Sequence, residues 1–323
     1  MPHNTVDFQE LLVRGQSGDK RAIGRMISHI ETYGLTENLI MRQLWAHTGH
    51  AVIVGITGAP GAGKSTLTDK MVKYWISKGY RVGVIAVDPS SPFTGGAILG
   101  DRVRMNDLAL IKEVYIRSMS TRGQLGGLSL ACSGAVSILD ACGYDIVLIE
   151  TVGVGQSEVA IMNVADLVLV ITVPGLGDEI QAIKAGVLEI GDVFAVNKKD
   201  LPGADRTSRE LQMMLDMNPN MGERQPPVLM VSAEKNDGVG DLCDSIMENY
   251  GCMKESDELL TRRNRRLREE LLAYMQDRVY RRVLAPVIEA DSFDDNINGF
   301  LSHSRNPYAW AEEIVSQIEE KIK

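Results

Sequence analysis

The stretch Gly58-Ala59-Pro60-Gly61-Ala62-Gly63-Lys64-Ser65 decides the fold of this chain. It matches the phosphate-binding pattern G-x-x-x-x-G-K-[ST] at every fixed position. The apolar run at residues 51–56 predicts a buried strand before it, and residues 64–78 predict a helix after it. A glycine-rich turn with an accidental lysine would lack this strand–loop–helix context. We therefore predict a loop that binds phosphate groups.

The residue types of this loop explain how it would hold phosphates. Glycines allow the backbone to approach the phosphates closely and to turn its N–H groups toward them. The N-terminus of the following helix adds partial positive charge. We expect Lys64 to reach the β- and γ-phosphates of a nucleotide and Ser65 to offer its hydroxyl to Mg²⁺.

Residues 51–250 alternate apolar strands with helices. Because the strands are nearly continuous in Val, Ile and Leu, we predict an α/β fold of the P-loop NTPase type, with a mostly parallel sheet covered by helices on both faces. The expected strands are 51–57, 81–87, 113–118, 145–150, 167–173, 192–197 and 227–232. The expected helices lie near 64–78, 128–142, 156–163, 179–188, 205–216 and 238–249.

The two ends of the chain read as helical additions to this domain. Residues 1–50 fit two amphipathic helices, which form an N-terminal extension. We expect the nucleotide-binding domain to occupy 51–253 and a C-terminal helical region to occupy 254–323. In that region, 254–286 read as one long charged helix with an apolar stripe, and a short amphipathic helix follows Asn306-Pro307-Tyr308. We interpret the arginine-rich run at 262–268 as a solvated or subunit-facing surface, because glutamates are interleaved with it.

Composition excludes several classes of protein. The chain has 323 residues, 44% of them hydrophobic, and a formal net charge of −9, which argues against nucleic acid as the main partner. We expect no membrane span, because no run of about eighteen apolar residues occurs. The four cysteines show neither a CxxC pair nor zinc-ligand spacing, so we expect reduced, buried thiols and a cytoplasmic protein.

A second motif, Asn197-Lys198-Lys199-Asp200, follows an apolar strand and matches N-K-x-D. A carboxylate at Asp200 can accept hydrogen bonds from N1–H and N2–H₂ of guanine, whereas adenine offers no such donor pair. We expect Asp200 to select the base and Lys198 to lie against its plane. The segment Ser232-Ala233-Glu234 follows the next strand, where backbone N–H groups can reach the guanine carbonyl oxygen.

A third segment, 145–156, delivers an acidic residue and then a pair of glycines after a strand. This is typical of the γ-phosphate sensor and Mg²⁺ shell of GTPases. Gly153 can donate its N–H to the γ-phosphate, and Glu150 can hold the metal directly or through water. Release of the γ-phosphate would free this loop, which makes it a candidate switch.

Two aspartates and several cations are further candidates. Asp88 follows the strand next to the phosphate loop and can reach Mg²⁺ or the attacking water, although a turn cap before Pro89 is the alternative. Asp101 is a second metal candidate, with a helix N-cap as its alternative. Lys184 is one of three cations, with Arg102 and Arg104, that can bring positive charge to the phosphoryl group; each is a surface residue if judged alone.

The motifs G-A-P-G-A-G-K-S-T, V-D-P-S-S-P-F-T-G-G-A-I-L-G-D-R, I-E-T-V-G-V-G-Q-S-E and N-K-K-D together resemble the MeaB/ArgK group of P-loop GTPases. The resemblance covers essentially the whole chain. It implies slow GTP hydrolysis, homodimers formed through the C-terminal helices, and a chaperone role toward adenosylcobalamin-dependent acyl-CoA mutases. It implies that Gly58 to Thr66 bind the nucleotide.

The same resemblance implies functions for further residues. Asp88, Asp101 and Glu150 would serve Mg²⁺ and the switch. The segment 173–184 would form an additional switch loop that communicates with the mutase, with Asp178 and Lys184 as signalling residues.

Two alternative functions, a small-molecule kinase and a metallochaperone, are also compatible with the phosphate-binding loop. A small-molecule kinase needs an acceptor pocket and a closing lid, and the sequence offers no clear lid. A metallochaperone calls for a cluster of histidines and cysteines, whereas the five histidines of this chain are scattered.

Overall fold

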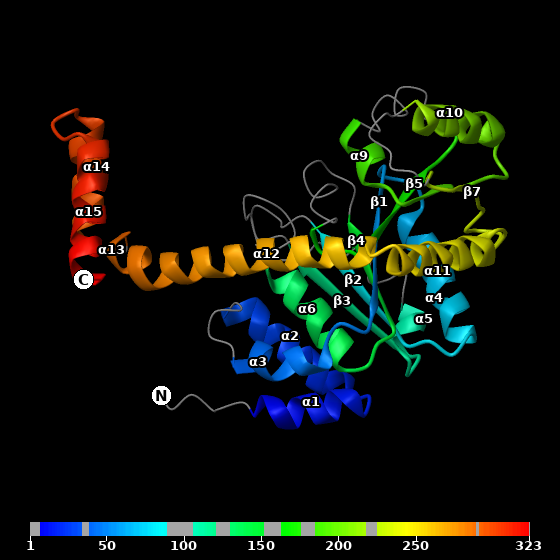
Figure 1. Cartoon of the computed structure of the whole chain (residues 1–323), viewed down its shortest axis with the longest axis horizontal. Coiled ribbons are helices and arrows are strands. Elements are labelled where there is room, and N and C mark those ends of the chain that lie inside the picture. The colour runs from blue at the N-terminus through cyan, green and yellow to red at the C-terminus, as the bar shows by residue number, and fades with distance from the viewer. Residues whose placement is uncertain are drawn as a thin grey trace. The chain divides into compact units, whose positions relative to one another are not determined.

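A computed structural model describes residues 7–33, 39–88, 106–120, 130–151, 163–175, 185–217, 225–288 and 291–322. The chain divides into two compact units, Met1–Leu267 and Arg268–Lys323. Figure 1 shows the sheet of the first unit and the helices of both. The domain limits expected at residues 50 and 253 stay predictions.

The described part of the first unit contains a seven-stranded sheet in which every neighbouring pair is parallel, in the order β3-β2-β4-β1-β5-β6-β7. The expected fold class is confirmed, and each strand begins and ends within two residues of its expected limits. The strands are β1 Val52–Gly58, β2 Val82–Asp88, β3 Val114–Ser120, β4 Ile146–Thr151, β5 Leu167–Thr172, β6 Val193–Val196 and β7 Val228–Met230.

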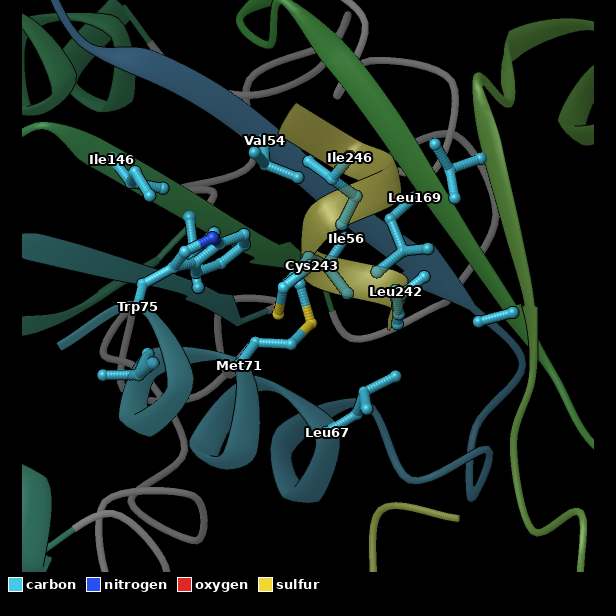
Figure 2. Packing of buried hydrophobic residues seen from close by; sticks show 14 of the residues in the cluster. Val54, Ile56, Leu67, Met71, Trp75, Ile146, Leu169, Leu242, Cys243 and Ile246 are labelled. Carbon is cyan, nitrogen blue, oxygen red and sulfur yellow. The ribbon is translucent and has the colours of Figure 1, made fainter. Parts of the chain in front are cut away.

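Helices cover both faces of this sheet (Figure 1). On one face, α4 (Lys64–Ser77) and α11 (Val239–Glu255) pack against each other and against the strands. Figure 2 shows Leu67, Met71 and Trp75 of α4 meeting Leu242 and Ile246 of α11 over the central strands. On the other face, α6 (Leu130–Ala141) lies against β2 and β4. Because all seven strands are parallel, their carboxyl ends share one edge, where ligands of open α/β sheets bind.

Three further helices lie between the remaining strands. They are α5 Asn106–Ala109, α9 Ala185–Ile190 and α10 Ala204–Asp216. The helices expected at 128–142 and 205–216 are present as α6 and α10. Part of the helix expected at 179–188 is present as α9, and the helix expected at 156–163 lies almost entirely outside the described residues.

The N-terminal extension contains three described helices rather than the expected two: α1 Phe8–Gln16, α2 Lys20–Tyr33 and α3 Leu39–Leu44, followed by a 3₁₀ turn at Trp45–His47. The third helix was missed because it is only six residues long. The end of the extension is joined to α6 by Asp140, whose carboxylate accepts the N–H groups of Gly49, His50 and Ala51.

Part of the arginine-rich run makes internal contacts. Arg262, Arg263 and Arg266 do so, which corrects the interpretation as a solvated or subunit-facing surface at these three positions, whereas Arg265 and Arg268 are exposed. The long charged helix expected at 254–286 is present from Glu258 onward: α12 runs from Glu258 to Val279 and continues through a π-helical turn, whereas α11 ends at Glu255. From α12, Arg263 and Arg266 donate to the fully buried carboxylate of Asp166. Arg262 donates to Asp192 at 2.7 Å and 2.9 Å.

These aspartates each precede a strand, Asp166 before β5 and Asp192 before β6. They also accept backbone N–H groups, Asp166 from Ile53 and Asp192 from Val168. The arginine contacts therefore fasten the start of α12 to the amino edge of the sheet, opposite the edge that carries the phosphate loop.

The second unit consists of helices. After α12, a π-helical turn at Tyr280–Leu284 leads into α13 (Ala285–Ile288). Pro286 explains this turn, because proline lacks an N–H and its ring clashes with the carbonyl four residues earlier in an α-helix. Helix α14 (Asp291–Leu301) was not expected, whereas the expected tail helix is present as α15 (Pro307–Ile322). Asn306 caps α15 by accepting the N–H groups of Tyr308 and Ala309.

Two further expectations concern the whole chain. In the described residues, no helix is both long enough and apolar enough to cross a bilayer. All four cysteines are free; Cys132, Cys142 and Cys243 are buried, but Cys252 is exposed, which corrects the expectation of four buried thiols.

The Asp166 contacts predict a specific loss of stability. Asp166→Asn removes the charge that balances Arg263 and Arg266, and breaking a buried ion pair on one side costs about 3 kcal/mol. We expect the free energy of unfolding in urea to decrease by about that amount. Glu258→Gln is the matched control, because Glu258 bonds Arg262 from a position 40% exposed and its loss should cost less than about 1 kcal/mol. Equal losses in the two variants would contradict this account of the arginine contacts.

Candidate functional site

The phosphate loop connects β1 to α4 at the carboxyl edge of the sheet. Its backbone is left-handed at Gly58 (φ 141°), Gly61 (φ 77°) and Gly63 (φ 84°), a conformation that favours glycine. A Cβ atom at Gly58 would lie 2.1 Å from the carbonyl oxygen of Ile171, and one at Gly63 would lie 2.5 Å from Nδ2 of Asn197. The loop is therefore packed against the ends of β5 and β6 with no space for side chains at these two positions.

Lys64 is held inside this loop. The residue is 7% exposed, and its Nζ donates to the carbonyl oxygens of Gly58 at 2.8 Å and Ala59 at 3.0 Å. Positive charge is thus concentrated where the loop N–H groups and the N-terminus of α4 also favour an anion. Among the other loop residues, Ala62 is buried, and Pro60 and Thr66 are exposed.

Oxygen ligands suitable for a magnesium ion lie beside Lys64. Ser65 is in the first turn of α4, and its Oγ donates to Oε1 of Glu150, near the end of β4, at 2.5 Å. A hydroxyl and a carboxylate at this separation are the hard oxygen donors that Mg²⁺ prefers. These two residues therefore fit a magnesium site, in which the ion would neutralise phosphate charge.

Four other predicted residues cannot be placed in this arrangement. The backbone of Asp88 ends β2, where it pairs with Ser120 of β3, but its side chain lies outside the described structure. Asp101, Gly153 and Lys184 are also outside the described residues. Their expected roles toward the metal ion and the γ-phosphate stay predictions.

Asn197 joins the phosphate loop to the segment that follows β7. Its Nδ2 donates to the carbonyl oxygen of Ala62 at 2.9 Å, and its Oδ1 accepts the N–H of Ala233 at 3.0 Å. The side chain is buried, with the residue 2% exposed. Asn197 thereby fixes the spacing between the loop and the second half of the site.

That second half is centred on the carboxylate of Asp200. Its Oδ1 accepts the hydroxyl of Ser232 at 2.7 Å, and Oδ2 lies 3.3 Å from Nζ of Lys235. The hydrogen bond from Ser232 is the main cause of a lowered pKa at Asp200. An ionised carboxylate accepts hydrogen bonds and donates none, which suits the N–H groups on the guanine edge.

The remaining predicted residues of the segments 197–200 and 232–234 have different surroundings. Lys198, with a left-handed φ of 58°, extends its Nζ to the carbonyl oxygen of Gly61 at 3.0 Å. The N–H of Ser232 donates to the carbonyl oxygen of Asp237, and the N–H of Ala233 donates to Oδ1 of Asn197. The expected contact from backbone N–H groups of this segment to a guanine oxygen stays a prediction. Glu234 is exposed.

Comparison with known proteins identifies the family. Residues 21–287 match the family model described as methylmalonyl Co-A mutase-associated GTPase MeaB. The chain belongs to the MeaB family. The family resemblance given by the sequence motifs is therefore confirmed.

Individual relatives agree with this assignment, and one solved structure agrees with the fold. A protein of Pyrococcus horikoshii named as a GTPase is 45% identical over 314 residues, which cover 96% of this chain and 98% of that protein. The methylmalonic aciduria type A homolog, mitochondrial, of Caenorhabditis elegans is 33% identical over 273 residues, which cover 83% of this chain and 68% of that protein. The crystal structure of an LAO/AO transport system kinase has a TM-score of 0.70 and 24% identity, and the match covers 99% of this chain and 98% of that one, which supports the fold.

Membership in a family of GTPases makes guanine nucleotides the expected ligand of this edge of the sheet. That the phosphate loop and Asp200 contact the two ends of one nucleotide stays a prediction. The sequence motifs missed two residues of this site, Thr68 and Lys235, which contact Glu150 and Asp200 respectively. Thr68 lies three residues after Ser65, a spacing that places both on one side of a helix and was the available signal.

The Asp200 geometry predicts how base preference can be changed. Asp200→Asn replaces an acceptor by an amide that can donate to the additional carbonyl of xanthine. We expect GDP binding to weaken by roughly 10- to 100-fold, because hydrogen bonds to a charged group are lost, and xanthosine diphosphate to bind more tightly than GDP. Titration calorimetry with both nucleotides measures this change.

Asp237→Asn is the control for that substitution. The Asp237 side chain is 60% exposed. It forms an ion pair with Lys199, whereas Asp200 pairs with Lys235. We expect its GDP affinity to match the wild type. If Asp200→Asn keeps the wild-type preference for GDP, the assignment of Asp200 as the base selector is wrong.

Proposed function

We propose that this chain hydrolyses GTP to GDP and phosphate in a Mg²⁺-dependent reaction and uses it to act on an adenosylcobalamin-dependent acyl-CoA mutase, such as methylmalonyl-CoA mutase. In this role it gates cofactor loading and protects or reactivates the mutase. The observation that supports the nucleotide part is the pair of hydrogen bonds by which Asn197 joins the phosphate loop at Ala62 to Ala233, next to Ser232, which donates to Asp200. The mutase part is supported by the description of the family and by the name of the nematode relative.

The proposed chemistry relies on positioning and on neutralisation of charge. Phosphoryl transfer to water requires little covalent participation by the protein. Lys64 and the loop N–H groups hold the phosphates, and Ser65 and Glu150 hold the magnesium ion together with Asp88 and Asp101. Gly153 would sense the γ-phosphate, and Lys184 would add positive charge or pass the signal to the mutase.

The unassisted reaction is proposed to be slow. The fastest GTPases use a glutamine that orients the attacking water or an arginine that stabilises the transition state. The motifs of this chain assign phosphate, metal and base contacts but no residue of either kind. Ordering of the switch segments by the mutase would then increase the rate.

Phosphate release tests this proposal and separates it from a kinase, the activity for which the similar solved structure is named. We expect slow release of phosphate from GTP with Mg²⁺ and no acceptor, faster release when adenosylcobalamin-dependent methylmalonyl-CoA mutase is added, and none from Lys64→Ala. Lys73→Ala is the control, because Lys73 is exposed on the same helix and pairs with Asp69. Release that requires an added acceptor would favour a kinase, and a rate unchanged by mutases would contradict the proposed partner.

A homodimer is part of the same proposal. In the second unit, α12 carries Leu271, Met275 and Val279 at four-residue spacing, exposed by 50%, 51% and 55%. Residues four apart lie on one side of a helix, so these side chains form an apolar stripe that a second copy of the chain would cover.

Four free cysteines suit a reducing compartment, and we place the protein in the cytoplasm on that ground.

The apolar stripe gives a test of the dimer. Met275→Glu places a charge in the middle of the stripe and is expected to convert the dimer into a monomer. Glu270→Gln, a change at a charged position of the same helix outside the stripe, serves as the control. Sedimentation velocity measures both. A monomeric wild type, or a Met275→Glu variant that remains a dimer, would contradict the proposal.

A further inference from the structure

We propose that Thr68 is a positioning residue for the magnesium shell: its hydroxyl holds the Glu150 carboxylate in the orientation that the metal ion requires. This inference rests on the proposed GTPase function. It goes beyond it by assigning a role to a residue of α4 that lies outside the phosphate-loop motif.

The Glu150 carboxylate is gripped at both of its oxygens by one helix. Oε1 accepts the hydroxyl of Ser65 at 2.5 Å, and Oε2 accepts the hydroxyl of Thr68 at 2.9 Å. Residues three apart share one side of a helix, so α4 presents the two hydroxyls together toward the end of β4. The plane of the carboxylate is therefore set by two points of contact on a rigid element.

Burial makes the Thr68 contact important. Thr68 is fully buried and Glu150 is 7% exposed. A buried carboxylate oxygen that loses its donor carries a desolvation cost and tends to turn toward another partner. Replacing the Thr68 hydroxyl would thus change the direction of the carboxylate rather than merely remove one bond.

The Thr68 hydroxyl has a second acceptor within reach, the carbonyl oxygen of Lys64 at 3.0 Å. Bonding to the carbonyl four residues earlier is common for threonine in helices and would by itself be structural. A hydroxyl has only one proton, so it can serve one of these acceptors at a time. The two roles make different predictions, because only the bond to Glu150 connects Thr68 to metal binding.

Ser65 and Thr68 have different tasks in this arrangement. The oxygen of Ser65 is the group expected to ligate Mg²⁺, and its proton can still be donated to Glu150 because a hydroxyl is both donor and acceptor. Thr68 lies deeper along α4 and contacts the far oxygen of the carboxylate. It acts through Glu150, as residues that orient metal ligands from the next layer do.

The test measures metal dependence rather than turnover. The dissociation rate of an N-methylanthraniloyl derivative of GDP is recorded over a range of free Mg²⁺ concentrations, which gives the Mg²⁺ concentration for half-maximal nucleotide retention. We expect Thr68→Val to raise this concentration by about tenfold, because loss of an orienting partner commonly lowers metal affinity 10- to 100-fold. Thr68→Ser keeps the hydroxyl and is expected to retain the wild-type value to within about twofold.

Two further measurements separate orientation from a packing defect. The dissociation rate in excess EDTA should be the same in wild type and Thr68→Val, because no metal is present for Glu150 to serve. In a Glu150→Gln background, Thr68→Val should shift the Mg²⁺ midpoint by less than about twofold, because its effect passes through the carboxylate. If Thr68→Val does not fold, Thr68→Ala, which is smaller and also lacks the hydroxyl, is compared with Thr68→Ser in the same assay.

The outcomes distinguish this inference from the proposed function. A wild type that binds no guanine nucleotide, or binds it without any Mg²⁺ dependence, would overturn the proposed function and the inference with it. A Mg²⁺-dependent wild type with an unshifted Thr68→Val midpoint would overturn the inference alone. So would equal shifts in Thr68→Val and Thr68→Ser, or a full shift that persists in the Glu150→Gln background.

Discussion

The side chain of Asn197 is the contact on which the rest of the site depends. It donates to the Ala62 carbonyl in the phosphate loop and accepts from the Ala233 N–H after β7. Three segments that are far apart in the sequence therefore share one buried amide. Gly63 has no space for a side chain because this amide occupies it. The distance between the phosphate cradle and the Asp200 carboxylate is consequently fixed by the protein.

The sheet supplies a second fixed element on the metal side of the site. β1 ends in the phosphate loop and pairs directly with β4, which carries Glu150 opposite Ile56. The helix that follows the loop then returns Ser65 and Thr68 to the same carboxylate. The residues expected to contact phosphate, metal and base thus follow strands of the same edge, because the carboxyl ends of an all-parallel sheet meet there.

Much of this architecture could be predicted from the sequence because its signals are local. Buried parallel strands read as continuous apolar runs, and the phosphate loop and the N-K-x-D motif each directly follow such a run. The contacts of Arg263 and Arg266 with Asp166 could not be predicted, because an arginine on a charged helix looks the same whether it faces solvent or a buried carboxylate. Helix α14 was missed although Phe293, Ile297 and Leu301 recur at a four-residue spacing that fits a helix, so its signal was present in the sequence.

The proposed site requires one guanine nucleotide to span the phosphate loop and Asp200. Calorimetric titration of the wild-type chain with GDP and with ADP, both at saturating Mg²⁺, tests it most directly. We expect one GDP per chain and binding of ADP weaker by at least about 100-fold, because adenine leaves the Asp200 carboxylate without its donors. Equal affinity for the two nucleotides, or binding of neither, would contradict it.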